Sequence, residues 1–235
     1  MSSTDAPARV GVLAPMPSEM QPVVKAMGLH RGDGDAYYRG RVGTSEVTAG
    51  RTGIGTKRAT EAATRLLDAA AVDHVIVVGI AGGMGSTKVG EVLFPEIAVD
   101  KQSGTEYRAT PFGGVVVQGK LVTHDDFDMG PGEHHRLVAD GFVAVDMETA
   151  AIAAVCAGRD VPWLAVRSIS DLVGVTPGDV IDLANPDGSP NVKASVRYLL
   201  TKPWRIPKLA KLAVDARGAA NGAARAAARS LGARS

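Results

Sequence analysis

The sequence is poor in cysteine, in aromatic residues and in long apolar runs. Its single cysteine, Cys156, cannot form a disulfide within the chain, and aromatic residues make up only 4% of the 235 residues. No stretch approaches the roughly 18 consecutive apolar residues that a membrane span needs. The first nine residues lack the apolar segment of a secretory signal. We therefore expect a cytoplasmic protein in a reducing compartment.

The composition is that of a folded domain, with 45% hydrophobic and 22% charged residues and 28 glycines. The net charge of +1 hides an asymmetry, because residues 202–235 hold eight basic residues and one acid, Asp215. The remaining residues, 1–201, therefore carry about −6, which argues against nucleic acid as a partner. We predict a catalytic domain over 1–201 and a basic, Ala/Arg-rich tail over 202–235. We expect the tail to be partly helical or, beyond about residue 216, disordered.

Apolar runs that alternate with helical patterns predict an α/β fold with a largely parallel or mixed sheet. Glycine-rich residues 79–83 are expected to form a turn after a buried strand, and 171–190 to form a loop. Ser18 is a candidate N-cap of the first helix. The expected strands are 9–14, 37–42, 45–49, 74–78, 92–99, 114–122, 142–145 and 163–170, and the expected helices are 18–27, 57–70, 147–157 and 191–201.

Several residues of interest follow these predicted strands directly. They are Glu19, the glycines of 79–83, the acids of 146–148 and Asp171. Ligands of α/β sheets bind beyond the carboxyl ends of the strands, so this convergence predicts a site there. Glu148 could accept hydrogen bonds from a vicinal diol such as a ribose, and Asp171 in an apolar cleft could act as a general acid.

Each of these features also has a purely structural explanation. The glycines of 79–83 suit a strand-exit turn, acids at 146–148 stabilise a helix N-terminus, and Asp171 suits a turn. Residues 124–128 and 133–135 combine histidines with acids, but their spacing matches no common metal motif. We expect no metal there, and instead a solvated loop that carries one useful aromatic, Phe127.

Four segments together resemble the nucleoside phosphorylase/nucleosidase superfamily, of the purine nucleoside and uridine phosphorylase type. The 5′-methylthioadenosine/S-adenosylhomocysteine nucleosidases are closest in these motifs. The resemblance implies a three-layer fold with a central mixed sheet flanked by helices. The segments are ValGlyValLeuAlaProMetProSerGluMet (10–20), ThrGlyIleGly (52–55), ValValGlyIleAlaGlyGly (77–83) with LysValGlyGlu (88–91), and PheValAlaValAspMetGluThrAlaAlaIle (142–152) continuing to ValProTrpLeuAlaValArgSerIleSerAsp (161–171).

The resemblance also implies a role for individual residues. Asp171 matches the acid that protonates the departing purine, Glu19 the acid that activates water, and Arg167 the arginine near that water. Glu148 matches the carboxylate that holds the ribose hydroxyls, and Met147 packs under the sugar. Phe127 matches the aromatic that stacks on the base, and the backbone of Asp128 would read the base edge. Ile80, Ala81, Gly82 and Ser170 complete the predicted substrate-binding set.

Two departures from the family pattern bear on the reaction. Val77 and Ile80 stand where many phosphorylases of this family carry an arginine and a serine for phosphate, which favours water as the nucleophile. Ile80 also replaces a serine that the nucleosidases usually carry. Arg51, Lys57 and Arg167 remain as candidate phosphate ligands. The stretch between Val99 and Val115 is short, which suggests an open 5′ pocket and a bulkier 5′ group.

Residues 185–213 are similar to hopanoid-associated nucleoside phosphorylase-like proteins, which implies a lipid at the ribose 5′ position. In 202–213, Trp204, Ile206, Leu209 and Leu212 lie among basic residues. This pattern is compatible with weak contact between the tail and a membrane surface.

We predict hydrolytic cleavage of the N-glycosidic bond of a purine nucleoside, and we expect the base to be adenine. Phosphorolysis of a 5′-substituted, lipid-linked adenosine is the first alternative, and a non-catalytic nucleoside- or lipid-surface-binding protein is the second. The expected partner is a small-molecule nucleoside, with no cofactor except phosphate as co-substrate if the reaction is phosphorolytic. The resemblance further implies a homodimer or larger homo-oligomer.

Overall fold

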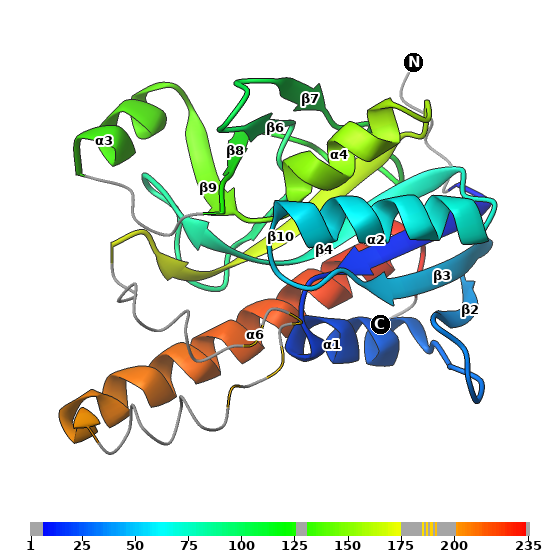
Figure 1. Cartoon of the computed structure of the whole chain (residues 1–235), viewed down its shortest axis with the longest axis horizontal. Helices are drawn as coiled ribbons and strands as arrows, with labels where there is room; N and C mark the ends of the chain where they lie inside the picture. The colour runs from blue at the N-terminus through cyan, green and yellow to red at the C-terminus, as the bar shows by residue number, and fades with distance from the viewer. Residues whose placement is uncertain are drawn as a thin grey trace.

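The protein is described here by a computed structural model, which covers residues 7–125, 131–174 and 201–233 and the single positions 185, 187, 189 and 191. It is an α/β structure with one mixed sheet flanked by helices (Figure 1), as the sequence predicts. The strands are β1 (Arg9–Ala14), β2 (Tyr38–Val42), β3 (Ser45–Arg51), β4 (His74–Gly83), β5 (Val92–Leu93), β6 (Ile97–Asp100), β7 (Glu106–Arg108), β8 (Lys120–Thr123), β9 (Phe142–Asp146) and β10 (Trp163–Leu172). The helices are α1 (Pro17–Met27), α2 (Thr56–Ala69), α3 (Pro131–Ala139), α4 (Thr149–Ala157), the short 3₁₀ helix η2 (Pro203–Arg205) and α6 (Ile206–Ser230).

The centre of the sheet is parallel. β1 lies between β3 and β4, and β10 pairs with the other side of β4. Strands β1, β4 and β10 are buried on both faces, which explains their continuous apolar sequences, whereas β3 is partly exposed. The last two residues of β4 pair antiparallel with β9, and β8, β6 and β7 continue the sheet beyond it. The carboxyl ends of β4 and β10 therefore lie side by side, and β9 meets them there.

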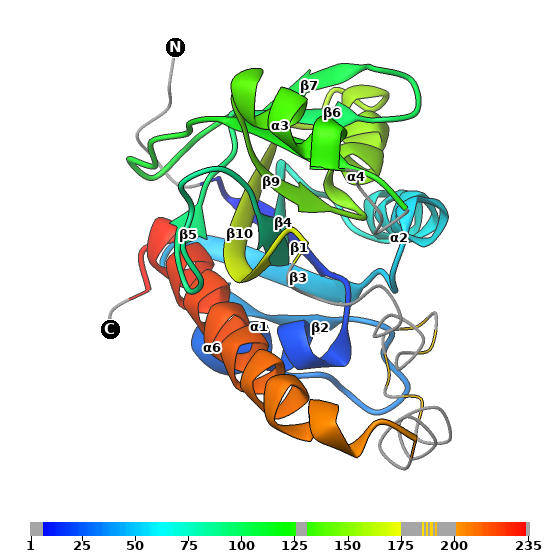
Figure 2. The same ribbon diagram turned by 90° about the vertical axis from the view of Figure 1, so that its left-hand side faces the viewer.

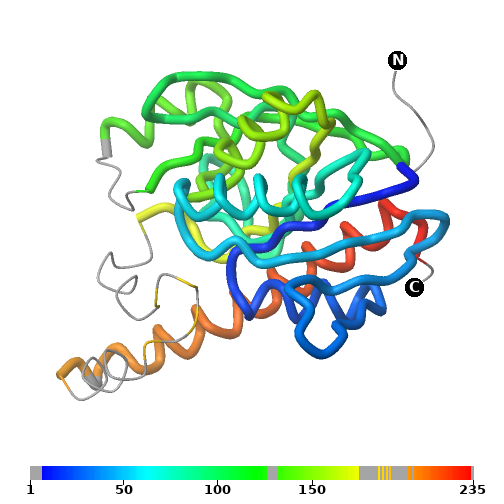
Figure 3. The backbone as a smooth tube through the Cα atoms, turned by 45° about the vertical axis from the view of Figure 1, so that its right-hand side comes forward, coloured from blue at the N-terminus to red at the C-terminus, as the bar shows by residue number. Residues whose placement is uncertain are grey.

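The helices form a layer on each face of the sheet. Helices α2 and α4 pack together on one face, and α1 and α6 pack together on the other (Figures 1 and 3). Helix α2 approaches β1 closely because Gly11 has no side chain: a Cβ there would lie 2.8 Å from Cδ2 of Leu66. This arrangement leaves the carboxyl ends of the strands between the two helical layers.

Helix α6 corrects one expectation. The chain beyond residue 216 is not disordered, because α6 continues to Ser230 and its carboxyl-terminal half packs against β10, β4 and α1. Its buried residues are almost all alanines, and Gly222 faces Ser168 of β10, so the helix can lie close to the sheet. The alanines, which in the sequence suggested a solvated tail, thus form the surface through which α6 packs on the sheet.

Other boundaries also differ from the prediction. Ser18 is not the N-cap, because α1 begins at Pro17 and the carboxylate of Glu19 accepts the backbone N–H of Met16. Residues 79–83 are not a turn but the end of β4, since β10 continues alongside them. The strand expected over 92–99 is two strands, β5 and β6, and of 114–122 only the end is a strand, β8.

Part of the segment expected as a solvated loop is helix α3, which contains His134 and His135. The helix expected over 191–201 falls almost wholly outside the described residues. Within the described residues, no helix has both the length and the apolar character needed to cross a bilayer.

Candidate active site

A cluster of charged side chains lies beside the middle of β4 and β10, next to the end of β9. Its centre is Arg167 of β10, whose side chain is 0% exposed. One terminal nitrogen of the guanidinium, Nη2, lies 2.5 Å from Oδ2 of Asp146 at the end of β9. The same nitrogen lies 3.6 Å from Oε2 of Glu148, two residues further along. A buried arginine requires such partners, because an unpaired charge in the interior is very costly.

Two threonines hold the carboxylate of Asp146 in place. The hydroxyl of Thr123 donates to Oδ1 at 2.6 Å, and the hydroxyl of Thr149 donates to Oδ2. Thr149 also accepts two hydrogen bonds from Arg167, from Nε at 3.2 Å and from Nη2 at 2.9 Å. Asp146 and Thr149 therefore fix one edge of the guanidinium.

The other edge of the guanidinium faces Glu19, which comes from the first turn of α1. Oε1 of Glu19 accepts the backbone N–H of Ile80 at 2.8 Å, and Oε2 accepts that of Met16 at 2.9 Å. Both side chains converge over Gly79 of β4. A Cβ on Gly79 would lie 2.5 Å from Oε1 of Glu19 and would also clash with Nη1 of Arg167. Glycine is therefore required at 79 for the two groups to meet.

Burial changes the proton affinities of the two glutamates. Desolvation raises the pKa of Glu19 to about 7, although the positive charge of Arg167 and the two N–H donors oppose the rise. Desolvation and the nearby charge of Asp146 raise the pKa of Glu148 to about 8. Near neutral pH, Glu19 can therefore take up or release a proton, and Glu148 is mostly neutral.

Arg167 stays charged in this setting. Burial alone would lower its pKa, but the charges of Asp146, Glu148 and Glu19 outweigh that effect and raise it. The cluster thus surrounds one permanent cation with three carboxyl groups. Such a cluster has little capacity for a further anion.

Glu148 also connects the cluster to a distant loop. Its Oε1 accepts the backbone N–H of Gly55 at 3.0 Å, which places the end of β3 and the start of α2 at the site. Its Oε2 is the oxygen that faces Arg167. Met147, between the two acids, is half-buried.

Asp171 lies further along β10, beyond a bulge at Ser170. The register with β4 shifts between Ile169 and Asp171, so that Asp171 pairs with Gly82. The Ser170 hydroxyl lies 2.6 Å from Oδ1 of Asp171 and 3.4 Å from the Ala81 carbonyl oxygen, and can donate to either. Asp171 is half-buried. Arg167 pairs with Gly79 and Asp171 with Gly82, so three residues of β4, roughly 10 Å, separate the two positions, a span suited to a ligand of nucleoside size.

The structure thus brings Glu19, Arg167 and Glu148 into one cluster and places Asp171 on the same strand end. Ile80 contributes through its backbone, because its N–H binds Glu19 and its carbonyl lies 3.4 Å from Nη1 of Arg167. Phe127 and Asp128 lie outside the described residues. Val77 is fully buried in the core, whereas Arg51 and Lys57 are exposed.

Sequence reasoning missed the supporting residues Thr123 and Thr149, and it singled out Gly79 only as one of the glycines of 79–83. It noted Asp146 only as an acid at a helix start. A local pattern cannot show that Asp146 and Thr149 contact Arg167, since this depends on how β9 and β10 pair with β4. The glycine-rich 52–55 segment did contain a signal, because Gly55 supplies a donor to Glu148.

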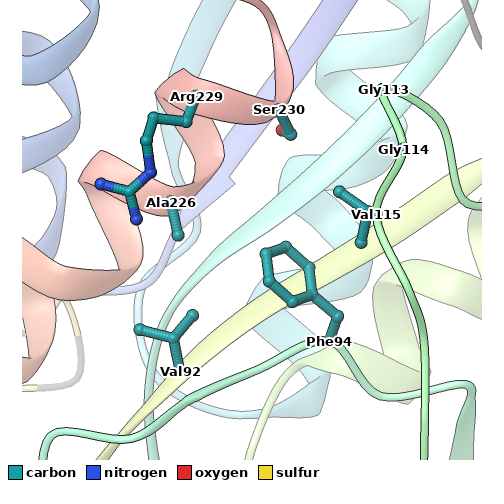
Figure 4. Close-up of a pocket in the computed structure, with 8 residues that line it drawn as sticks. All are labelled: Val92, Phe94, Gly113, Gly114, Val115, Ala226, Arg229 and Ser230. Atoms are coloured by element: carbon teal, nitrogen blue, oxygen red, sulfur yellow. The ribbon is translucent and has the colours of Figure 1, made fainter. Parts of the chain in front are cut away.

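A separate pocket of about 280 Å³ lies between β5, residues 113–115 and the end of α6 (Figure 4). Phe94 and Val115 line it, and the guanidinium of Arg229 is directed away from both. None of the cluster's carboxylates is among its lining residues. Among the described residues, no three histidines, cysteines or acids are placed to hold a metal ion.

Comparison with known proteins agrees with this architecture. The 5′-methylthioadenosine/S-adenosylhomocysteine nucleosidases of Tolumonas auensis and Aeromonas salmonicida are 29% and 30% identical to this chain in sequence. Each match covers 71% of this chain and 87% of the relative. The solved structure of such a nucleosidase from Colwellia psychrerythraea, in complex with adenine, has a TM-score of 0.69 at 20% identity, and the match covers 97% of this chain and 96% of that one. A family model described as the phosphorylase superfamily matches residues 9–119 and 108–197. The chain therefore belongs to the phosphorylase superfamily.

Proposed function

We propose that this protein is an N-ribosyl hydrolase that cleaves the N-glycosidic bond of a purine nucleoside. The observation that carries the proposal is the position of Glu19. Its carboxylate is buried beside Arg167, and burial raises the pKa of Glu19 to about 7. A general base is most effective when its pKa lies near the working pH. The relatives named above, nucleosidases acting on adenine nucleosides, support the same reaction and adenine as the base.

In the proposed reaction, Glu19 accepts a proton from a water molecule while the water oxygen forms a bond to the anomeric carbon of the ribose. The bond from that carbon to the purine nitrogen breaks, and its electron pair moves into the base. Asp171 donates a proton to the purine ring, so that the base leaves neutral. Glu148 binds the ribose hydroxyls, and the products are the free base and the ribose derivative.

The charge of the cluster favours water over phosphate as the nucleophile. The guanidinium of Arg167 is already paired with Asp146 and lies close to Glu148, so little of its positive charge is available to a phosphate. The apolar side chains of Val77 and Ile80 supply no compensating donors. Arg51 and Lys57 are exposed, and the phosphorolytic alternative would depend on them and on Arg167.

The remaining expectations are part of this proposal. Phe127 stacks on the base, the Asp128 backbone reads its edge, and Met147 packs under the sugar. The short stretch between Val99 and Val115 leaves room for a substituted ribose 5′ position, including a lipid as the similarity of residues 185–213 implies. The enzyme works in the cytoplasm as a homodimer without a cofactor.

The test is release of free base from adenosine, methylthioadenosine and S-adenosylhomocysteine, followed by chromatography with and without phosphate. We expect equal adenine release in both conditions for at least one substrate. Release that requires phosphate would establish phosphorolysis instead. If none of the three is cleaved, adenosine with a hydrophobic 5′ chain tests whether the 5′ group was the obstacle, and no release from it would favour a binding protein.

Two isosteric variants assign the roles within this assay. Glu19→Gln should abolish hydrolysis, because an amide cannot accept the proton from water. Asp171→Asn should abolish turnover of purine substrates while substrate binding persists. Full activity of either variant would remove that residue from the proposed mechanism.

A further inference from the structure

The start of α6 and the η2 turn before it expose apolar side chains outside the candidate site. Trp204 is 73% exposed, Val214 70% and Ile206 46%. Ile206, Ala210 and Val214 follow one another at intervals of four residues, so they lie on one face of the helix, and Ala210 is exposed as well. Leu209 and Leu212, on another face, are half-buried. The apolar stripe therefore faces away from the protein.

The same segment is strongly basic. Asp215 is the one acid in residues 202–217, and its carboxylate lies 2.5 Å from the Nζ of Lys211. The basic residues of the segment are Lys202, Arg205, Lys208, Lys211 and Arg217. The segment therefore carries +4, while residues 1–201 carry about −6. Lys211 follows Ala210 directly and Arg217 follows Val214 by three residues, so these two cations lie beside the apolar stripe. An apolar stripe bordered by cations is typical of helices that lie at a membrane interface.

The position of the segment leaves it accessible. In Figures 1 and 2, the first turns of α6 extend beyond the sheet, on the side toward which β4 and β10 direct their carboxyl ends. A surface that met these turns would therefore face the same side of the molecule as the candidate site.

We propose that residues 204–217 dock the protein on an anionic lipid surface. Trp204, Ile206 and Val214 enter the headgroup region, and Arg217, which follows Val214 by three residues on the same side of the helix, lies near lipid phosphates. Charge favours this occupant over a second copy of the chain, because two such segments in contact would repel each other. With few apolar anchors and several cations, docking is reversible and weakens as salt screens the charges. The proposal does not depend on the reaction at the site.

Trp204 provides the measurement. The other tryptophan, Trp163, is 4% exposed and reports on the core, so a change in emission on adding vesicles comes from Trp204. We expect a blue shift and co-sedimentation with vesicles of phosphatidylglycerol and phosphatidylcholine, and neither with phosphatidylcholine alone. Arg217→Gln should lower the partition coefficient about fivefold, the effect of one basic residue near an anionic surface.

Matched variants separate docking from general charge attraction. Arg65→Gln removes one positive charge from the exposed surface of α2, in the other helical layer, and should leave partitioning unchanged. Trp204→Ser leaves the charge unchanged and should weaken partitioning several-fold. Circular dichroism checks that each variant is folded.

Three results would overturn the proposal. The first is no association of the intact protein with anionic vesicles at low salt. The second is equal partitioning of the intact protein, Arg217→Gln and Trp204→Ser. The third is a dimer in sedimentation whose Trp204 emission is already blue-shifted without lipid, which would assign this surface to a second copy of the chain.

Discussion

At the scale of single residues, Glu19 has the two properties that activation of water requires. Two backbone N–H groups fix its position, and burial brings its pKa to about 7. The same N–H donors favour the charged form, so they keep the pKa from rising further. Position and proton affinity therefore both follow from where the first turn of α1 meets β4.

The pH dependence of kcat/KM tests this assignment. A base must be deprotonated to work, and the pKa of Glu19 is raised from its ordinary value of 4.5 to about 7. We therefore expect kcat/KM to fall as the pH decreases through about 7, since this parameter reports the pKa of the free enzyme. Stopped assays of adenine release across the pH range measure it. A profile that stays level from neutral pH down to about pH 5 would contradict the role of Glu19.

Thr149 is predicted to position Arg167 without contacting substrate. Thr149→Val removes the oxygen that accepts hydrogen bonds from Nε and Nη2, and should cost about 1–3 kcal/mol of stability. We expect kcat to fall about tenfold, corresponding to about 1.4 kcal/mol, with a small change in KM. Thr149→Ser keeps the oxygen and is the control. Equal kinetics for the two variants would show that the oxygen does not orient Arg167.

At the scale of elements, strand β4 shows why a glycine-rich strand end is needed here. Gly79 leaves the space in which Glu19 and Arg167 meet, and β10 pairs with this part of the strand. Gly79→Ala should therefore displace both charged groups and reduce kcat by about 100-fold or more, comparable to the loss of one stabilising group at a transition state. Gly132→Ala in α3, where a Cβ would have no neighbour within 4 Å, is the control outside the site. Steady-state kinetics with circular dichroism distinguish loss of the site from loss of the fold.

Helix α6 leads to a second prediction at this scale. Ala223 is fully buried and Ala213 is exposed on the same helix. Ala223→Leu should destabilise the protein by about 1–3 kcal/mol through overpacking, whereas Ala213→Leu should change stability by no more than about 0.5 kcal/mol. Urea unfolding measures both. Similar stabilities for the two variants would argue against the packing of α6 on the sheet.

The sequence predicts elements well where a local pattern defines them. Strands β1, β4 and β10 begin where their apolar runs begin, and α1, α2 and α4 lie close to their expected ranges. The glycines at 79–83 misled the prediction, because a glycine can mark a turn or a place where other side chains must pass close to a strand. The alanines of α6 misled it for a similar reason: small residues suit both a solvated helix and a tight packing surface.

The candidate site is harder to predict because it exists only in the folded molecule. Glu19, Gly55, Glu148 and Arg167 come from four separate segments, and the contacts among them depend on sheet register. The family resemblance identified most of the charged residues. It did not indicate Thr123 and Thr149, whose hydroxyls hold Asp146, because their roles are visible only once β8, β9 and β10 are assembled.

At the scale of the whole molecule, the division into a body and a basic tail has a structural consequence. Every predicted site residue precedes residue 202, and the catalytic domain predicted from the sequence lies wholly in 1–201. However, the carboxyl-terminal half of α6 covers β10 and β4 on the face opposite α4. Its buried residues include Ala219, Ala223 and Ala227. The tail therefore completes the core that supports the site.

A chain that ends at Thr201 should consequently lose the cooperative fold as well as activity. Removing α6 would expose the sheet face that Gly222 and its neighbouring alanines cover, including the region of Ser168 and Val92. A chain that ends at Gly232 keeps all of α6 and is the matched control, with stability and adenine release like those of the full chain. Thermal unfolding and sedimentation of the two shortened chains make the comparison. The chain ending at Thr201 could instead unfold cooperatively at the same temperature as the control. In that case α6 would not be needed for the fold, and residues 1–201 alone would hold Glu19, Arg167 and Glu148 together.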